Sequence, residues 1–290
     1  MPPFTDDFCF LPAGELARRI RAGEVSPTES LAALVERIGR IDPLLNTYAC
    51  LDLEGALVDA KHKEQLLANA GAETDLGPLF GVPVAVKDDL PVKGMPCKAG
   101  SRLCSDLVAE YDDLTVQRLR AAGAIILGKT HLPEFGHKGT TDNRLSPDGS
   151  RKVTVSPWGG RDRTAGGSSG GSASAVAAGL AHLALGTDIG GSIRIPASCC
   201  GVVGLKPTFG TIPRVPSGNA FSLWVSGPIA RTVADVALAM RVLAGPHPGD
   251  RFSIPLADND AFDLKRPLPR RLRVGWPVSV TGEPVDAAVE

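Results

Sequence analysis

The chain has 290 residues, of which 43% are hydrophobic and 22% charged, a composition ordinary for a globular protein with a substantial core. The formal net charge of −1, without a long run of one sign, argues against a dedicated nucleic-acid surface. The six cysteines form no Cys-x-x-Cys pair and no stretch approaches the roughly 18 apolar residues of a membrane span, so we expect reduced thiols and no membrane contact.

The first third of the chain is predicted to be helical. Ser26-Pro27-Thr28-Glu29 combines an N-cap serine, a proline at the first helical position and a capping-box glutamate, which predicts a helix through about Arg40. Its apolar stripe comprises Leu31, Leu34, Val35 and Ile38. A second helix is expected from about Leu53 to Ala70. The N-terminus lacks the basic start and apolar core of a signal peptide, so we expect a cytoplasmic protein.

Beyond about residue 75, short β-rich runs alternate with helical stretches. This pattern predicts an α/β sheet covered by helices on both faces. The expected strands are Val82–Val86, Ala124–Leu127, Leu183–Leu185, Val202–Leu205 and Leu272–Val274. The expected helices are Leu114–Ala122, Ala173–Leu180 and Val233–Leu243.

The C-terminal part differs in amino-acid composition from the rest of the chain. Residues 245–270 are rich in Pro, Asp and Arg and are expected to form an irregular surface segment. Residues 271–276 resemble a strand, and residues 284–290 resemble the first turn of a helix, at which the chain ends. We therefore expect either a fragment or a frayed last element.

One stretch matches the phosphate-loop pattern letter for letter. Residues 123–130 read GAIILGKT, but a phosphate cradle needs a flexible loop whose backbone amides point inward. The four residues between the glycines are Ala-Ile-Ile-Leu, which favour a buried strand, and Pro133 disfavours a helix directly after it. The pattern therefore indicates a strand rather than a nucleotide site.

The histidines and cysteines do not indicate a metal site. His131, Glu134 and His137 lack the spacing of a helical His-Glu-x-x-His motif, and the vicinal pair Cys199-Cys200 reads as two small buried residues. A Ser-His-Asp triad has no support in the local sequence, although such triads assemble through space. We expect no metal and no organic cofactor.

Two glycine- and serine-rich stretches are the strongest functional signal. Residues 164–174 read TAGGSSGGSAS, which is compatible with a linker, a phosphate loop or part of an active site. Its flanks are structured, and a linker would have featureless ones. Residues 186–196 read GTDIGGSIRIP, in which successive backbone N–H groups beside Ser192 favour an oxyanion hole with a serine nucleophile.

A serine nucleophile needs a base to take its proton. Lys87 ends an apolar run, Gly81–Val86, and burial there would lower its pKa and leave a neutral amine. From the residues alone, a lysine that reaches water at the end of a strand is the alternative interpretation.

Together these motifs closely resemble the amidase signature family. The resemblance rests on residues 81–88, 165–172 and 186–196, in that order, and on the following Cys200-Gly-Val-Val-Gly-Leu-Lys-Pro-Thr208. It extends from the N-terminal helices through Trp276. It implies a mixed β-sheet covered on both faces by helices. It also implies one domain over residues 1–290, with a helical segment at 1–75, a catalytic core at 76–245 and an irregular segment at 246–290. The family's domain continues beyond residue 290, so we expect a chain truncated at its C-terminus.

The resemblance also implies a Ser–cis-Ser–Lys triad. The nucleophile falls on Ser192, the bridging serine on Ser168 and the base on Lys87, with a cis peptide between Gly167 and Ser168. Supporting roles fall on Ser169, which strengthens the network, and on Asp188 and Arg194, which orient the loop. The oxyanion hole is expected from the backbone N–H groups of Ile189, Gly190, Gly191 and Ser192. One departure is Asp89, where many relatives carry asparagine.

The implied activity is hydrolysis of a small-molecule carboxylic amide to an acid and ammonia or an amine. A glutaminase subunit of a tRNA-dependent amidotransferase is one alternative, and a truncated non-catalytic homologue is another. Residues 135–143, FGHKGTTDN, resemble the stand-alone amidases more closely. Whether the protein forms a homodimer stays open.

Overall fold

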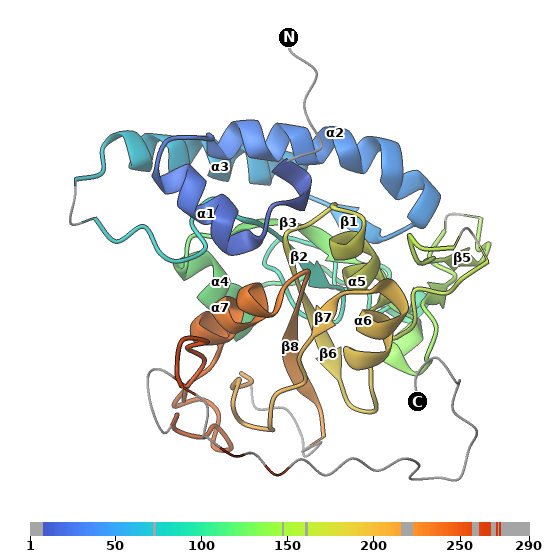
Figure 1. Cartoon of the computed structure of the whole chain (residues 1–290). Coiled ribbons are helices and arrows are strands. Elements are labelled where there is room, and N and C mark those ends of the chain that lie inside the picture. Colours follow the sequence, from blue (N-terminus) through green and yellow to red (C-terminus); the bar gives the residue numbers. More distant parts are fainter. Residues whose placement is uncertain are drawn as a thin grey trace.

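The protein is built around one mixed sheet with helices on both faces (Figure 1). The computed structural model describes residues 8–71, 74–146, 148–159, 162–215, 223–256 and 261–267, together with Arg271 and Arg273. The helices are α1 (Ala13–Arg21), α2 (Pro27–Leu45), α3 (Leu53–Ala68), α4 (Leu114–Ala121), α5 (Gly170–Ala177), α6 (Arg194–Cys200) and α7 (Val233–Leu243). Three short 3₁₀ helices lie at Phe8–Phe10, Arg102–Cys104 and Glu134–Gly136.

The main sheet has six strands in the order β1-β3-β2-β6-β8-β7. Its strands are β1 (Tyr48–Leu51), β2 (Pro83–Lys87), β3 (Ile125–Thr130), β6 (Leu183–Asp188), β7 (Val203–Gly204) and β8 (Val225–Ala230). The central strand β2 is parallel to both β3 and β6, whereas β1, β8 and β7 pair in antiparallel fashion with their neighbours. A separate ribbon joins β4 (Asp142–Asn143) and β5 (Lys152–Val153).

Alternation along the strands separates two hydrophobic cores. Val84 and Val86 of β2 pack into the core that α1, α4 and α7 cover, and Ala85 packs into the core that α2, α3 and α5 cover. Because successive side chains of a strand point to opposite faces, Lys87 lies on the same face as Ala85, toward α5. The predicted α/β class with helices on both faces is confirmed.

Most of the predicted strands are present, but two strands of the main sheet and the two short strands of the ribbon, β4 and β5, were missed. The strand β1 has only four residues, and β8 contains Gly227 and Pro228, which both disfavour a strand assignment. A Cβ atom at Gly227 would lie 2.1 Å from the Leu205 carbonyl oxygen, so close packing requires glycine there. The strand expected at 272–274 and the helical turn expected at 284–290 lie outside the described residues, apart from Arg273.

The helix predicted to end near Arg40 continues to Leu45. Proline does not stop it, because Pro43 lies in the last turn, and the helix ends at Asn46 in the left-handed conformation. At the start of the same helix, Ser26 and Glu29 form the predicted capping box. Among the described residues, no helix has the length and apolar character needed to cross a membrane.

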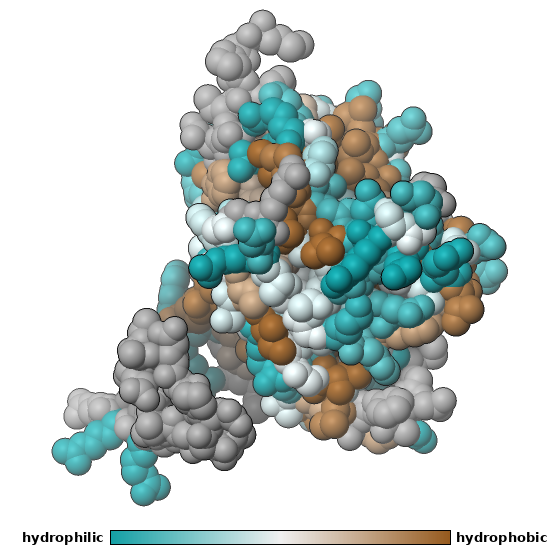
Figure 2. All heavy atoms as spheres, turned by 90° about the vertical axis from the view of Figure 1, so that its right-hand side faces the viewer, coloured by the Kyte–Doolittle hydropathy of each residue, from teal (hydrophilic) through white to brown (hydrophobic). Residues whose placement is uncertain are grey.

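The outer face on the right of Figure 1 is mixed in character. Figure 2 shows hydrophobic side chains there in small separate groups among hydrophilic ones. Scattered apolar side chains of this kind are ordinary for a protein surface and need no partner to explain them.

The glycine- and serine-rich stretch forms the start of α5, which excludes a linker. All eight residues of α5 are buried, and the helix begins at Gly170, three residues earlier than predicted. A Cβ atom at Gly171 would lie 2.6 Å from the backbone of both His131 and Thr47. The helix therefore approaches the neighbouring backbone more closely than alanine would permit.

Replacing this glycine should destabilise the fold. We expect Gly171→Ala to lower the free energy of unfolding by about 1–3 kcal/mol, because the backbone of two neighbouring segments must move. The matched control is Gly39→Ala in α2, where nothing lies within 4 Å of the added atom. It should stabilise the protein by about 0.5–1 kcal/mol. Urea midpoints measure both, and equal effects of the two substitutions would contradict the packing argument.

Candidate active site

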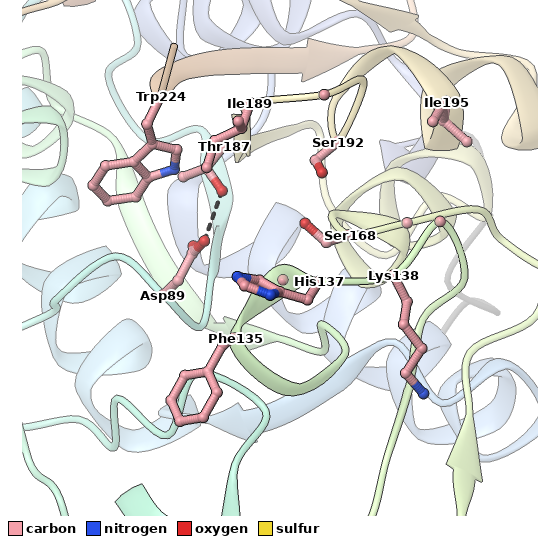
Figure 3. Close-up of a pocket in the computed structure, with 14 residues that line it drawn as sticks. Asp89, Phe135, His137, Lys138, Ser168, Thr187, Ile189, Ser192, Ile195 and Trp224 are labelled. Atoms are coloured by element: carbon pink, nitrogen blue, oxygen red, sulfur yellow. Dashed lines mark hydrogen bonds between the residues drawn. The ribbon is translucent and has the colours of Figure 1, made fainter. Parts of the chain in front are cut away.

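Four segments meet at one end of the sheet. Lys87 ends β2, Thr187 and Asp188 end β6, Ser168 precedes α5, and Ser192 lies on the loop before α6. Parallel pairing of β2 with β6 brings the carboxyl ends of these two strands together, because the carboxyl ends of parallel strands lie at the same edge of a sheet. Figure 3 shows the hydroxyls of Ser168 and Ser192 pointing toward the same central space.

Lys87 is completely buried and surrounded by oxygen atoms. Its Nζ atom lies 2.7 Å from Ser168 Oγ and 2.7 Å from Thr187 Oγ1. Asp89 Oδ2 lies 3.4 Å away. Burial lowers the pKa of the Lys87 amine from its ordinary value of 10.5, and the nearby Asp89 carboxylate acts against this. The structure therefore removes the alternative of a strand-end lysine reaching water.

Ser168 is 2% exposed and follows a cis peptide bond from Gly167, as the family resemblance implies. A Cβ atom at Gly167 would lie 2.6 Å from the Lys138 carbonyl oxygen, so this position requires glycine. Thr141 holds Gly166, the residue before Gly167, because the Thr141 hydroxyl donates to the Gly166 carbonyl at 2.8 Å. These contacts leave the Ser168 hydroxyl between Lys87 and the cavity.

Ser192 is more accessible than Lys87 and Ser168, since it is only half-buried. Its loop is held by Asp188, whose side chain is fully buried and accepts hydrogen bonds from the Ile193 N–H at 3.0 Å and from Arg194 at 2.9 Å. Burial acts to raise the pKa of Asp188, but the hydrogen bonds from Arg194 and the loop N–H groups lower it to about 2. Asp188 is therefore an ionised anchor for the loop.

One expected oxyanion donor is occupied by this anchor. The Gly191 N–H donates to Asp188 Oδ1 at 2.8 Å, contrary to the expectation that it faces an oxyanion. The physical reason is that a buried carboxylate is a strong acceptor close to the glycine. The N–H groups of Ile189, Gly190 and Ser192 have no acceptor among the described residues.

Ser169 joins three of the four segments. Its N–H donates to the Ser192 carbonyl at 3.0 Å, its hydroxyl donates to the Thr187 carbonyl at 3.3 Å, and the Thr187 N–H donates back to that hydroxyl at 3.3 Å. The side chain thus fixes the end of β6 against the start of α5.

The structure does not bring the three possible metal ligands together. His131 is buried and its Nδ1 lies 3.0 Å from the Asn143 amide nitrogen, whereas Glu134 accepts from Ser101. His137 lines the cavity beside Ser168. Burial lowers the pKa of His131 to about 4. In the part of the chain that the structure describes, no group of three or more His, Cys, Asp or Glu side chains is arranged to hold a metal ion.

Ser168 and Ser192 open into a cavity of about 350 Å³. Apolar side chains form much of its wall, and Figure 3 shows them around the two serines. They are Phe135, Ile189, Ile195 and Trp224. Asp89, His137 and Lys138 add polar groups. A cavity of this kind can hold a small organic molecule against the two hydroxyls.

The sequence reasoning missed two residues of this region. Thr187 contacts Lys87 directly, and its only signal in the sequence is a hydroxyl residue within the second glycine- and serine-rich stretch. Lys129 is a second fully buried lysine, whose Nζ lies 3.0 Å from Asp88 Oδ1 and 3.1 Å from the Pro96 carbonyl oxygen. It belongs to the GAIILGKT stretch, which forms strand β3 as predicted.

The amidase family model matches residues 29–290. The acylamidase of Rhodococcus erythropolis is 40% identical over 268 residues, which cover 92% of this chain and 54% of that protein. The A-type subunit of the glutamyl-tRNA(Gln) amidotransferase of Moorella thermoacetica is 42% identical over 284 residues, which cover 97% of this chain and 56% of that protein. This chain belongs to the amidase family, and the resemblance inferred from its motifs is confirmed.

Solved structures agree with this assignment. A 6-aminohexanoate cyclic dimer hydrolase in complex with its substrate superposes with a TM-score of 0.76 at 38% identity, over 86% of this chain and 49% of that one. A bacterial aryl acylamidase of the amidase signature family gives a TM-score of 0.77 at 33% identity, over 85% of this chain and 50% of that one. The chain therefore spans about half the length of the relatives it matches.

The two buried lysines should respond differently to substitution. We expect Lys129→Met to lower the free energy of unfolding by about 3–5 kcal/mol, because it leaves the buried Asp88 carboxylate without its cation. The control is Lys63→Met, whose partner Asp59 is 26% exposed and can be solvated. Its cost should be about 1 kcal/mol or less. Denaturation midpoints decide, and a loss as small for Lys129→Met as for the control would show that the Asp88–Lys129 pair does not stabilise the fold.

Proposed function

We propose that this protein hydrolyses carboxylic amides to an acid and ammonia or an amine, through an acyl-enzyme on Ser192. The observation that carries the proposal is the fully buried Lys87 amine, 2.7 Å from Ser168 Oγ, at a cavity that the half-buried Ser192 also lines. Burial lowers the pKa of this amine, which favours the neutral form that a base requires.

In the proposed reaction, neutral Lys87 takes the proton of Ser168, and Ser168 takes the proton of Ser192. The Ser192 oxygen then attacks the amide carbon, and the carbonyl oxygen becomes an oxyanion. The free N–H groups of Ile189, Gly190 and Ser192 are the donors available to hold it, since Asp188 occupies that of Gly191. The relay returns a proton to the leaving nitrogen, and water releases the acid from Ser192.

The proton step needs a side-chain movement. Within the described contacts there is no hydrogen bond between the hydroxyls of Ser168 and Ser192, although both point into the same space (Figure 3). Rotation about the Cα–Cβ bond of Ser192 brings its proton toward Ser168. Such bonds are often long or misaligned in a free enzyme and shorten when substrate binds.

The proposed substrate is a small-molecule amide, and the proposed location is the cytoplasm. The alternative of a glutaminase subunit keeps support, because the amidotransferase chain of Moorella thermoacetica is as similar to this protein as the Rhodococcus acylamidase is. A panel of aliphatic, aromatic and amino-acid amides separates the two. Ammonia release from glutamine that requires co-purified partner subunits would favour the glutaminase.

Ser192 should react with a fluorophosphonate probe. We expect covalent labelling of the folded chain at Ser192, with no labelling of Ser192→Ala. Lys87→Ala should slow labelling by about 10²–10⁴-fold, because it removes the base. Mass spectrometry locates the adduct, and circular dichroism checks the fold of each variant. An unlabelled Ser192 in a folded sample would favour the non-catalytic homologue, and unchanged labelling of Lys87→Ala would remove Lys87 as the base.

The labelling rate should depend on pH through Lys87. The amine acts as a base only when it is neutral, and burial lowers its pKa, so the rate should rise with pH and level off below the ordinary lysine pKa of 10.5. The rate constant is measured across the pH range in which the chain stays folded. A rate that still rises at an ordinary lysine pKa would mean that the base is not a buried amine.

A further inference from the structure

Lys87 and Asp89 are connected through one hydroxyl. Thr187 Oγ1 lies 2.6 Å from Asp89 Oδ2 and 2.7 Å from Lys87 Nζ, and Figure 3 shows the bond between Thr187 and Asp89 at the edge of the cavity. The carboxylate also lies 3.4 Å from the amine directly. Neither Thr187 nor Asp89 takes part in the proposed proton relay.

The protons in this chain of hydrogen bonds have only one arrangement. An ionised carboxylate accepts and does not donate, so the single Thr187 proton points to Asp89. The Thr187 oxygen must then accept from Lys87, and one N–H of the amine is directed at Thr187. A neutral amine has two N–H bonds and one lone pair, and the base needs that lone pair to face Ser168.

We propose that Asp89 is a positioning residue: through the Thr187 hydroxyl it orients the Lys87 amine so that its lone pair faces Ser168. This inference rests on the proposed function, since it concerns the same base. Without the carboxylate, the Thr187 hydroxyl is free to donate to the lone pair and to compete with Ser168 for it. An asparagine at this position would still offer its side-chain oxygen as an acceptor for the Thr187 proton.

The Asp89 carboxylate has few other partners. Its Oδ1 atom is buried and forms no hydrogen bond within the described part of the chain. Its side chain is 18% exposed, so water screens its charge only in part. The carboxylate therefore also acts on Lys87 as a charge.

The other charged groups around Lys87 are paired or remote from its amine. On β6, Asp188 is bound to Arg194, and on β3, Lys129 is bound to Asp88. In the cavity wall, Lys138 is bound to Asp142, and His137 lies beside it. The Arg214 guanidinium lies over the Trp224 ring, 3.1 Å from its centroid. Asp89 is thus the one carboxylate in contact with the amine among the described residues.

The test is the pH profile of Ser192 labelling by a fluorophosphonate in the full chain. Asp89→Ala and Thr187→Val should each lower the high-pH plateau of the rate constant by about tenfold. Each removes a hydrogen bond that holds the Lys87 amine in the orientation in which its lone pair faces Ser168. The double variant should lose no more than either single variant, since both act at one step. Thr187→Ser, which keeps the hydroxyl, should retain the plateau.

Asp89→Asn separates charge from orientation. It keeps an acceptor for Thr187, so the plateau should be retained, while loss of the negative charge should move the midpoint of the profile to lower pH by about one unit. The matched control is Asp112→Asn, whose carboxylate is also 18% exposed but pairs with Arg120. It should change neither the plateau nor the midpoint.

The outcomes are separable from those of the proposed function. If wild-type Ser192 is not labelled, the proposed function fails. If wild-type Ser192 is labelled but Asp89→Ala and Thr187→Val leave the plateau unchanged, or the double variant shows the product of the two single losses, the positioning role is wrong and the proposed function stands. An unchanged midpoint in Asp89→Asn would contradict only the effect of the Asp89 charge. Should Asp89→Ala not fold, the comparison of Thr187→Val with Thr187→Ser gives the same decision.

Discussion

The site depends on the burial of one amine. Lys87 ends a strand whose neighbours on both sides are parallel, so its side chain has no route to water and its Nζ must find partners within the protein. Burial disfavours the ammonium form, and the surrounding oxygen atoms supply hydrogen bonds to an amine without fully compensating a charge. The Lys87 Nζ atom finds these partners in Ser168, Thr187 and Asp89.

A second fully buried lysine has a different set of partners. Lys129 lies one strand away and is equally inaccessible, but a carboxylate 3.0 Å from its amine gives it a full ionic partner. This contact joins Lys129 of β3 to the start of the segment that follows β2. The two lysines differ in their nearest partners, which are a carboxylate for Lys129 and two hydroxyls for Lys87.

Part of the fold could be predicted because its signals are local. The capping box at Ser26, the apolar β-rich runs of β2 and β3, and the bounds of Val233–Leu243 follow from neighbouring residues. The strand β8 could not be predicted, because Gly227 and Pro228 are tolerated there only through contacts with distant segments. For the same reason α2 continues beyond its predicted end, since its last turn packs against the core through Leu45.

The sequence by itself determined which chemical groups are available and in what order: a lysine after an apolar strand and two serines in glycine-rich stretches, in the pattern of the amidase family. Only the tertiary structure decided which of their atoms face one another. Lys87 meets Ser168 and Thr187 across 81 and 100 positions of the chain. Asp188 takes the Gly191 N–H away from the cavity, and Asp89 sets the direction of the Thr187 proton. Burial and hydrogen-bond direction depend on all the neighbours at once, and those neighbours come from segments that only the folded sheet brings together.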